Sequence, residues 1–448
     1  MAIDLAKSSS LSPARRLAFE VLRRVEEGAY ASVLLASREE ELNPLDRGLA
    51  HELVMGVLRW QLWLDRLIEF YANRGADRLD PAVRIVLRLG LYQLRFLTRI
   101  PASAAVNESV NMVKIARLRS AGGLVNAVLR RATREADFDP AAKIQDPVER
   151  ISVATSHPAW LIERWIKAFG SDETEALARA NNEPAPVAFR VVTRRANETE
   201  VLEQLLQAGA TVTASRITPG AWRTTGGGSL LSELAANGEV YLQDEASQLV
   251  ALAVEAKTGE RVLDLCAAPG SKTTQIADYT NGLATIIASD FHEHRLRTLI
   301  SSVKTQQLGN VHCVVLDGLQ TLPMIAGFDR VLVDAPCSGT GTLRRNPEIR
   351  WRISAEDIAD FARRQKALLI NASRVVKPGG RLVYSTCSVE PDENEAVVAM
   401  FLENNESFEL AELSLSPSIV IGTGQARTWP HRAGTDGFFL CAFQRKRV

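Results

Sequence analysis

VLVDAPCSGTG, residues 331–341, is the segment around which the predicted fold is built, and LVYSTCSV, residues 382–389, follows the same pattern further along the chain. Each is a short apolar run that ends in small and polar residues around one cysteine, Cys337 or Cys387. Runs of this kind are typical of buried parallel strands. Ligands of open α/β sheets bind just beyond the carboxyl ends of such strands. The two segments therefore predict two strands of one sheet, with a thiol at the mouth of each.

Strand and helix patterns alternate from Asn237 to the end of the chain, which predicts an α/β fold with a doubly wound, mostly parallel sheet. Its strands are expected at residues 261–265, 285–289, 312–316, 330–333 and 381–385, and a long helix is expected at 355–376. Two further strands are expected, one at 239–242 at the start of this region and one at 438–443, which we predict to be an edge strand.

The first part of the chain shows helical patterns only. Ser12, Asn43 and Asp80 each precede a proline, as an N-cap precedes the first helical position. Further helices are expected at 104–118 and 123–134, so we predict a compact bundle. A β-α-β pattern follows at 187–217. The predicted domains are a helical bundle at 1–140, a small α/β module at 141–235 and a large α/β domain at 236–448.

The charge of the chain is uneven although its formal net charge is zero, with 53 basic and 53 acidic residues. Between Ser109 and Arg134 there is no Asp or Glu, and the basic residues are Lys114, Arg117, Arg119, Arg130, Arg131 and Arg134. A basic stretch inside a neutral protein indicates an RNA-binding face. The alternative is an ordinary solvated helix face.

The start of the chain lacks the apolar region of a signal peptide, and no apolar run reaches the length of about 18 residues that a membrane helix needs. We therefore expect a cytoplasmic protein with no membrane partner. The five cysteines form no C-x-x-C pair and no metal-ligand spacing with the six histidines, so neither a metal site nor disulfides are expected.

The segment DLCAAPGSKT, residues 264–273, predicts a ligand-binding turn between a strand and a helix. Its small residues let a ligand approach the backbone amides at the helix start. A phosphate-binding P-loop would need glycine where Cys266 and Ser271 stand, and the dinucleotide pattern G-x-G-x-x-G is absent. Cys266 itself is interpreted as a small residue at the core edge and not as a nucleophile.

Acidic residues stand at the ends of four successive predicted strands, among them Asp290, Asp317 and Asp334. Such an acid typically accepts hydrogen bonds from ribose hydroxyls. The set suits a cofactor that has a ribose, an adenine and a positive centre but no phosphate, and S-adenosylmethionine fits that description. The alternative is that these aspartates only form turns at strand ends.

The two cysteines suggest covalent chemistry on a pyrimidine. C5 of cytosine becomes nucleophilic when a thiolate adds to C6, and a carboxyl beside the base, such as Asp334, assists that addition at N3. An enzyme that methylates an amino group would more typically carry Asp/Asn-Pro-Pro-Tyr where this chain has Asp334-Ala335-Pro336-Cys337. Chemistry alone does not choose between Cys337 and Cys387 as the attacking thiol.

Motifs over nearly the whole chain resemble one family. Residues 266–272, 334–341, 345–351, 384–388, 393–395 and 436–439 resemble the Sun-type RNA cytosine-5 methyltransferases, while 101–110 and 125–130 resemble the NusB-like RNA-binding bundle. Together they are similar to the RsmB (Sun/Fmu) enzymes. Two positions depart from the family pattern: Ser271 replaces a second glycine, and Val192-Thr193 stand where the family often has asparagine.

The resemblance implies a class I, Rossmann-like methyltransferase that transfers methyl from S-adenosylmethionine to C5 of a cytidine in small-subunit (16S) ribosomal RNA. It implies that Cys387 is the nucleophile, that Cys337 assists release of the base, and that the donor is held by Cys266, Ala267, Ala268, Pro269, Gly270, Ser271, Lys272, Asp290, Asp317 and Asp334. Arg344, Arg345, Arg350 and Arg352 follow the Pro-Cys loop and are candidates to grip phosphates. A monomer is expected. The alternatives are the same chemistry on transfer RNA or another RNA, and a non-catalytic RNA-binding assembly factor.

Overall fold

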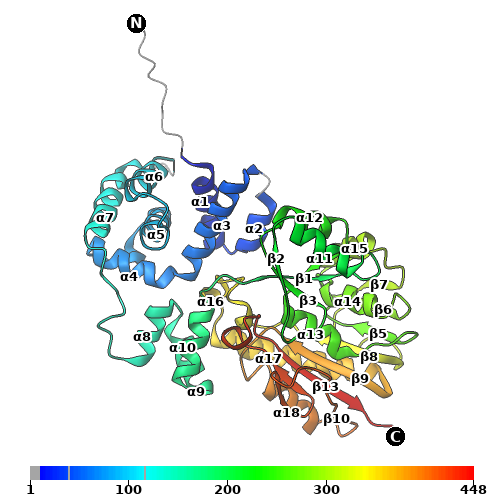
Figure 1. Cartoon of the computed structure of the whole chain (residues 1–448). Coiled ribbons are helices and arrows are strands. Elements are labelled where there is room, and N and C mark those ends of the chain that lie inside the picture. Colours follow the sequence, from blue (N-terminus) through cyan, green and yellow to red (C-terminus); the bar gives the residue numbers. More distant parts are fainter. Residues whose placement is uncertain (1–10, 39–40, 116–117, 448) are drawn as a thin grey trace. The chain divides into compact units, whose positions relative to one another are not determined.

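The computed structural model describes residues 11–38, 41–115 and 118–447 (Figure 1). Arg117, one of the predicted RNA-binding residues, lies outside the described residues. The chain divides into two compact units. Unit 1 comprises Met1–Glu183 and Leu343–Arg352, and unit 2 comprises Pro184–Thr342 and Ile353–Val448. No helix among the described residues is long and apolar enough to span a membrane.

Unit 1 is helical, as predicted. Its helices are α1 (Pro13–Glu26), α2 (Ala31–Arg38), α3 (Pro44–Arg59), α4 (Gln61–Ala72), α5 (Pro81–Phe96), α6 (Ala102–Ile115), α7 (Gly122–Arg134), α8 (Pro147–Thr155), α9 (Ala159–Phe169), α10 (Ser171–Ala180) and the short α16 (Ile349–Arg352). The side chains of Asn43 and Asp80 cap α3 and α5, whereas Ser12 makes no side-chain cap at α1. A single apolar core joins α1 to α7.

Helices α8 to α10 belong to unit 1, although the sequence pattern grouped them with the small α/β module. Buried polar contacts explain the difference. The Ser156 hydroxyl accepts a hydrogen bond from the backbone N–H of Leu62 at 2.9 Å. The buried guanidinium of Arg350 donates to the carbonyl of Ser156 and to the side chain of Asn182 at 3.1 and 2.9 Å. These partners are far apart in the sequence, so periodicity does not reveal them.

Unit 2 carries a small antiparallel sheet with the strand order β2-β3-β1-β4. Its strands are β1 (Val187–Val191), β2 (Thr211–Ala214), β3 (Ala221–Thr225) and β4 (Val240–Leu242), with helices α11 (Glu198–Gln207) and α12 (Gly228–Ala236). The strand expected at 239–242 is present as β4, but its assignment to the large domain was wrong. It pairs with β1, because Val240 packs with Phe189 and Val191 in the separate core of this small sheet.

The large sheet of unit 2 has nine strands in the order β11-β12-β13-β9-β8-β5-β6-β7, with β10 paired to β13. The parallel strands are β5 (Arg261–Asp264), β6 (Thr285–Asp290), β7 (Val311–Val315), β8 (Phe328–Asp334) and β9 (Val376–Thr386). The antiparallel strands are β10 (Phe408–Leu410), β11 (Val420–Gly422), β12 (Gln425–Arg427) and β13 (Phe439–Arg445). This architecture confirms the predicted α/β class.

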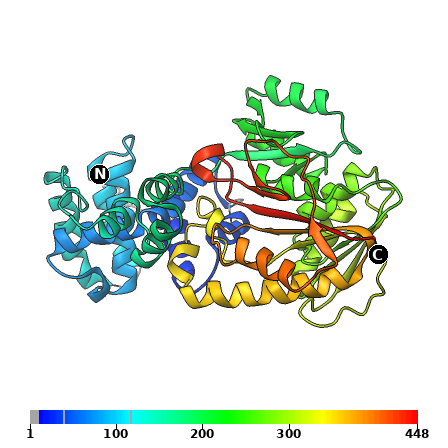
Figure 2. The ribbon, with the colours of Figure 1, turned by 90° about the horizontal axis from the view of Figure 1, so that it is seen from below.

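Helices that alternate with the strands along the chain pack against the sheet (Figure 2). They are α13 (Glu245–Val254), α14 (Ser271–Tyr279), α15 (Glu293–Thr305), α17 (Ala355–Val375), α18 (Glu395–Glu403) and the short α19 (Pro430–Ala433). The prediction that the last strand lies at an edge was wrong. Strand β13 pairs with β9 on one side and with β12 on the other, and Phe439 and Phe443 are fully buried.

The strand order reverses between β5 and β8, because β6 and β7 lie on one side of β5 whereas β8 and β9 lie on the other. Such a reversal opens a crevice at the carboxyl ends of the two strands, where ligands of open α/β sheets bind. Asp264 ends β5 and Asp334 ends β8, so two carboxyl groups flank this crevice.

Candidate active site at the carboxyl ends of the strands

Cys337 and Cys387, which follow two different strands, are neighbours in the structure. Asp334 of β8 pairs with Ser385 of β9, so both strands deliver their following loops to the same edge of the sheet. There the sulfur atoms of Cys337 and Cys387 lie 3.3 Å apart as free thiols. The contact with Cys387, together with burial, raises the pKa of Cys337 well above its usual value. Cys337 is therefore a thiol that keeps its proton while it faces Cys387.

A buried carboxylate, Glu393, ties the two cysteine loops together. It accepts hydrogen bonds from the backbone N–H of Ser338 at 2.8 Å, from the Ser338 hydroxyl and from the Ser388 hydroxyl. Gln365 of α17 donates to the same carboxylate at 3.0 Å. Ser338 follows Cys337 and Ser388 follows Cys387, so Glu393 fixes the backbone next to both thiols. The family motif contained Glu393, but no sequence pattern indicated this role.

The two loops also meet through glycines. Gly341 donates from its N–H to the carbonyl of Cys387 at 3.0 Å and accepts from the N–H of Gly437 at 2.8 Å. A Cβ atom on Gly341 would lie 1.9 Å from the Gly437 carbonyl oxygen, far inside contact distance. Only glycine lets the backbone approach so closely at this point. The backbone beside Cys387 is therefore held by packing as well as by hydrogen bonds.

Asp334 stands between the thiols and the turn after β5. One of its oxygens accepts a hydrogen bond from the Ser385 hydroxyl at 2.7 Å, and the other pairs with the ammonium of Lys272 at 2.7 Å. Burial alone would lower the pKa of Lys272, but attraction and hydrogen bonding to Asp334 outweigh it and raise the pKa. The pair is thus ionic, and Lys272 links the turn that starts α14 to the catalytic edge.

The other predicted donor residues surround the same edge. The backbone N–H of Ala267 donates a hydrogen bond to the carbonyl of Ser289. The Ala268 carbonyl accepts a hydrogen bond from the Arg295 guanidinium at 3.0 Å. Asp290 is buried and lies 3.5 Å from the Arg295 guanidinium. Asp317 is half-buried and accepts from the N–H of Leu319, as a turn-forming aspartate does. Burial and nearby carboxylates raise the pKa of Cys266, which disfavours a thiolate there.

Asp264 is a further acid of this edge that was not assigned to the donor from the sequence. It is fully buried and one of its oxygens accepts from the Thr273 hydroxyl at 2.6 Å. The other oxygen has no hydrogen-bond partner among the described residues. A buried oxygen without a partner needs a donor from outside the chain. A cationic, donor-rich ligand such as S-adenosylmethionine fits this oxygen and the neighbouring carboxylates.

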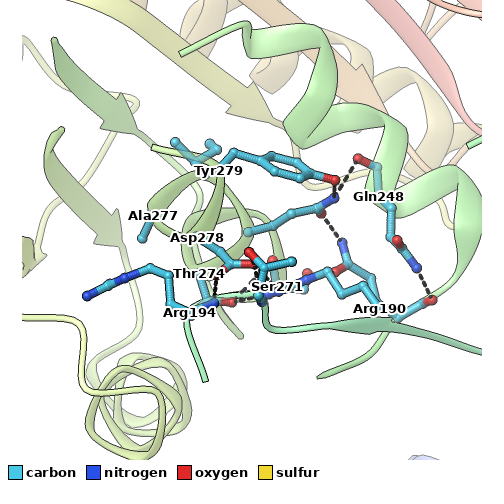
Figure 3. A network of polar contacts seen from close by, with 12 residues as sticks. Arg190, Arg194, Gln248, Ser271, Thr274, Ala277, Asp278 and Tyr279 are labelled. Carbon is cyan, nitrogen blue, oxygen red and sulfur yellow. Dashed lines mark hydrogen bonds and ion pairs between the residues drawn. The ribbon is translucent and has the colours of Figure 1, made fainter. Parts of the chain in front are cut away.

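A polar network fixes the helix that follows this turn (Figure 3). Arg190 of β1 is buried and donates to the Thr274 hydroxyl at 2.9 Å and to the side chain of Gln243 at 3.2 Å. Asp278 of α14 accepts from the backbone N–H groups of Thr193 and Arg194, each at 3.1 Å. Thr193, one of the two departures from the family pattern, therefore has a structural role in joining the small sheet to α14.

The predicted RNA-binding residues are spread over unit 1. Lys114, Arg119, Arg130 and Arg134 are exposed on or beside α6 and α7. Arg131 is half-buried on α7, where its guanidinium donates to the carbonyl of Phe70 at 2.9 Å and stacks on the Phe70 ring. Arg345 is half-buried in the segment Leu343–Arg352 of unit 1.

The arginines around Arg345 correct one expectation. Arg350 is fully buried against α8 and α10, and Arg352 donates to the carbonyls of Val25 and Ala29 at 2.7 and 2.6 Å. Arg344 is also buried. Arg344 and Arg350 therefore do not present their charge to phosphates, whereas Arg352 is exposed although its guanidinium is bonded to these carbonyls. Sequence alone showed a basic cluster but not the distant carbonyls that bind it.

Fold and site together define an S-adenosylmethionine-dependent methyltransferase of class I. Three family models match the chain: the 16S rRNA methyltransferase RsmB/F at residues 251–444, the NusB family at 12–134, and the ferredoxin-like domain of RsmF/B-like methyltransferases at 157–228. The chain belongs to the RsmB/F family of RNA methyltransferases.

Similar proteins match along almost their full length. The ribosomal RNA small subunit methyltransferase B of Pseudomonas putida is 36% identical over 90% of this chain and 92% of its own. The protein of that name from Pasteurella multocida is 33% identical over 99% of this chain and 98% of its own. The crystal structure of PH0851 superposes with a TM-score of 0.84 at 29% identity, covering 97% of this chain and 99% of that one.

Asp264 gives the donor site a testable pH dependence. Burial raises the pKa of Asp264 to about 7 from its usual acidic value. Below this pKa the group is neutral in the free protein, and above it the group is a carboxylate that attracts the cationic donor. We expect the affinity for S-adenosylmethionine to rise up to about tenfold from about pH 6 to about pH 8, with proton release on binding. Titration calorimetry in buffers of different ionisation enthalpy measures both.

The matched control is Asp264→Asn, which keeps the shape and removes the titration. Its donor affinity is expected to stay flat over the same pH range. An equally flat wild-type profile would mean that Asp264 does not face the donor.

Proposed function

We propose that the protein transfers the methyl group of S-adenosylmethionine to C5 of a specific cytidine in 16S ribosomal RNA through a covalent bond between Cys387 and C6. The observation that supports this most is the pair of thiols 3.3 Å apart beside Asp334, at the edge where the donor turn also ends. The name that the two relatives above share, ribosomal RNA small subunit methyltransferase B, supports the substrate class.

The first step is the addition of the Cys387 thiolate to C6. A new S–C6 bond forms, and the electron pair of the C5–C6 double bond moves toward C5. Asp334, which is paired with Lys272, accepts a hydrogen bond from a protonated N3 and so favours the ring form that is most easily attacked. When bound, the donor supplies an electrophilic methyl group to C5.

The last step restores the ring and needs a base for the C5 proton. While Cys387 is a thiolate, its hydrogen bond keeps the proton on Cys337. Once Cys387 is bonded to C6 it carries no negative charge, so the main cause of the raised pKa of Cys337 is gone. Cys337 then loses its proton to water and takes the C5 proton. The C5–C6 double bond re-forms and the S–C6 electron pair returns to Cys387.

The target base must leave any helical stack to reach Cys387, because the sulfur lies in a loop at the edge of a sheet and cannot enter a duplex. Contacts of Lys114, Arg119, Arg130, Arg134 and Arg345 with RNA belong to this proposal, as do the roles of residues 266–272, Asp290 and Asp317 at the donor. The predicted three-domain division, the monomeric state and the cytoplasmic location likewise stay predictions.

Incubation with labelled donor tests the substrate and the modified atom. The RNAs compared are naked small-subunit RNA, transfer RNA and assembled small subunits, and digestion to nucleosides identifies the product. We expect label in 5-methylcytidine from small-subunit RNA and none from transfer RNA. Label in transfer RNA alone would assign the same chemistry to another substrate. Label on an exocyclic amino group would contradict the covalent mechanism, and RNA binding without transfer would favour a non-catalytic assembly factor.

A further inference from the structure

Unit 2 contains a second ligand-sized hollow outside the thiol and donor sites, which we call the basic cleft. It has a volume of about 670 Å³ and lies between the small sheet and the C-terminal strands. Its lining includes Arg216, Arg223, Arg427, Arg432 and Trp429, and none of its lining residues is acidic. A cleft of this charge inside a neutral protein calls for an explanation.

The basic cleft opens on the same edge of the large sheet as the thiols. Phe439 of β13 pairs with Thr386 of β9 on one side and with Arg427 of β12 on the other. Thr386 directly precedes Cys387, and neighbouring strands lie about 4.8 Å apart. The backbone of Arg427 is therefore two strands, or about 10 Å, from the strand end that carries Cys387. A ligand bound at Cys387 would need to extend about 10 Å along this edge to approach the backbone of Arg427.

Hydrogen bonds hold the two walls of the basic cleft together. Arg223 comes from β3 of the small sheet and donates to the carbonyl of Ala433 in α19 at 2.8 Å. Arg223 is also bonded to the buried carboxylate of Glu245. The loop beyond α19 then returns to the Pro-Cys loop, where Gly437 donates to the carbonyl of Gly341 at 2.8 Å. The cleft is thus preformed and is connected by one short segment to the backbone beside Cys337.

The four arginines of the lining differ in their exposure. Arg427 is paired with Glu395 at 2.8 Å and is almost fully buried, while Arg223 is paired with Glu245. Arg216 and Arg432 are exposed. Trp429 is only 8% exposed and supports the arginines, since the guanidinium carbons of Arg427 and Arg432 lie 5.1 and 5.8 Å from its ring centroid. Such stacking orients cations and leaves their N–H groups to bind anions.

These features fit one class of ligand. Two exposed guanidinium groups in a lining without carboxylates attract a chain of phosphates. Ile421, which is 52% exposed in the same lining, offers an apolar contact to a base. We propose that the basic cleft binds the unpaired RNA strand next to the target cytidine, with Arg216 and Arg432 contacting its phosphates. This inference rests on the proposed function and adds a second RNA contact within unit 2 itself.

The test is direct binding of a single strand. A fluorescein-labelled oligocytidylate of about twelve nucleotides spans a site of this kind, and anisotropy reports its affinity without any methyl transfer. For the double variant Arg216→Ala/Arg432→Ala of the full chain we expect several-fold weaker binding. We also expect the slope of log affinity against log salt to fall by about 1.4, which corresponds to about 0.7 for each lost phosphate contact on a single strand.

The matched control is Arg374→Ala, because Arg374 is exposed near the end of α17, next to the opposite end of β9. It removes one positive charge away from the thiol edge, whereas the double variant removes two, and it is expected to leave the salt slope unchanged. An equal slope and affinity in the double variant and the control would overturn the proposal. A second result would also overturn the proposal. If an oligoglutamate peptide binds in the cleft while oligocytidylate binding does not depend on Arg216 and Arg432, the partner of the cleft is an acidic protein segment.

Methyl transfer separates this inference from the proposed function. In the double variant we expect a raised KM for small-subunit RNA and an unchanged kcat at saturating RNA, because neither arginine touches the reacting atoms. An unchanged KM would contradict the cleft assignment. If the wild type fails to methylate any RNA, the proposed function fails, while the anisotropy result still decides whether the basic cleft binds a single strand.

Discussion

Cys387→Ala is expected to reduce methyl transfer by at least about 10³-fold and to abolish the covalent RNA–protein adduct. Without the sulfur, C6 is not attacked and C5 stays too weak a nucleophile to accept a methyl group. The expected loss is in kcat, because neither donor nor RNA binding depends on this side chain. Transfer of labelled methyl to small-subunit RNA and a denaturing gel of the protein with that RNA measure the two effects.

Cys313→Ala is the matched control, since it removes a half-buried thiol from β7, away from the reacting edge. It should retain wild-type activity. If the Cys387→Ala protein still forms an adduct and Cys337→Ala does not, the two cysteines have exchanged roles. Equal activity of all three proteins would refute covalent catalysis by either thiol. The structure makes an exchange of roles a meaningful alternative, because the two sulfur atoms are close enough for one pyrimidine to reach both.

Local sequence patterns predicted the parts of the fold that neighbouring residues determine, namely the strands and the turns that follow them. Strand periodicity, the small residues after β5 and the acids at strand ends placed Asp264, Asp290 and Asp334 along one edge, because the carboxyl ends of parallel strands meet there. The approach of Cys337 to Cys387 follows from the same rule, since β8 and β9 are neighbours. The sequence could therefore place the candidate residues at one edge of the sheet, while their chemical roles stay predictions.

What the sequence did not reveal depends on contacts between distant residues. The carboxylate of Glu393 accepts hydrogen bonds from both cysteine loops. The buried guanidinium of Arg350 donates to a carbonyl more than a hundred residues earlier in the chain. The strand at 240–242 carries an ordinary strand pattern, and only its pairing with β1 places it in the small sheet. Likewise, β13 looked like an edge strand because the short β11 and β12 carry too weak a pattern to be predicted.

The position of Glu393 also explains why the thiols need not be cross-linked to stay close. Four donors satisfy its carboxylate, and three of them come from Ser338 and Ser388, the residues directly after the cysteines. Charge-assisted hydrogen bonds of this kind hold their partners more firmly than neutral ones. The two sulfur atoms are thereby kept at a distance where the protonation of one can respond to the charge of the other.

Cys337→Ala is expected to accumulate the covalent RNA adduct and to lower multiple turnover about 10²- to 10⁴-fold, the usual cost of removing a positioned base. The first steps need only Cys387, so attack on C6 and methylation of C5 proceed. Loss of the C5 proton is then slow, and the S–C6 bond persists. We expect a single methyl group to be incorporated per protein and a band on a denaturing gel that contains RNA, protein and label together.

The label distinguishes where the reaction stops. An adduct that carries the transferred methyl group means that Cys337 acts after methylation, in agreement with its proposed role as the base for the C5 proton. An adduct without the methyl group would instead place Cys337 before the transfer and contradict that role. Cys337→Ser provides a stricter comparison, because a hydroxyl fills the same space but is a far weaker acid than a thiol. It should therefore trap the adduct as alanine does, whereas a purely steric role for residue 337 would let serine restore turnover.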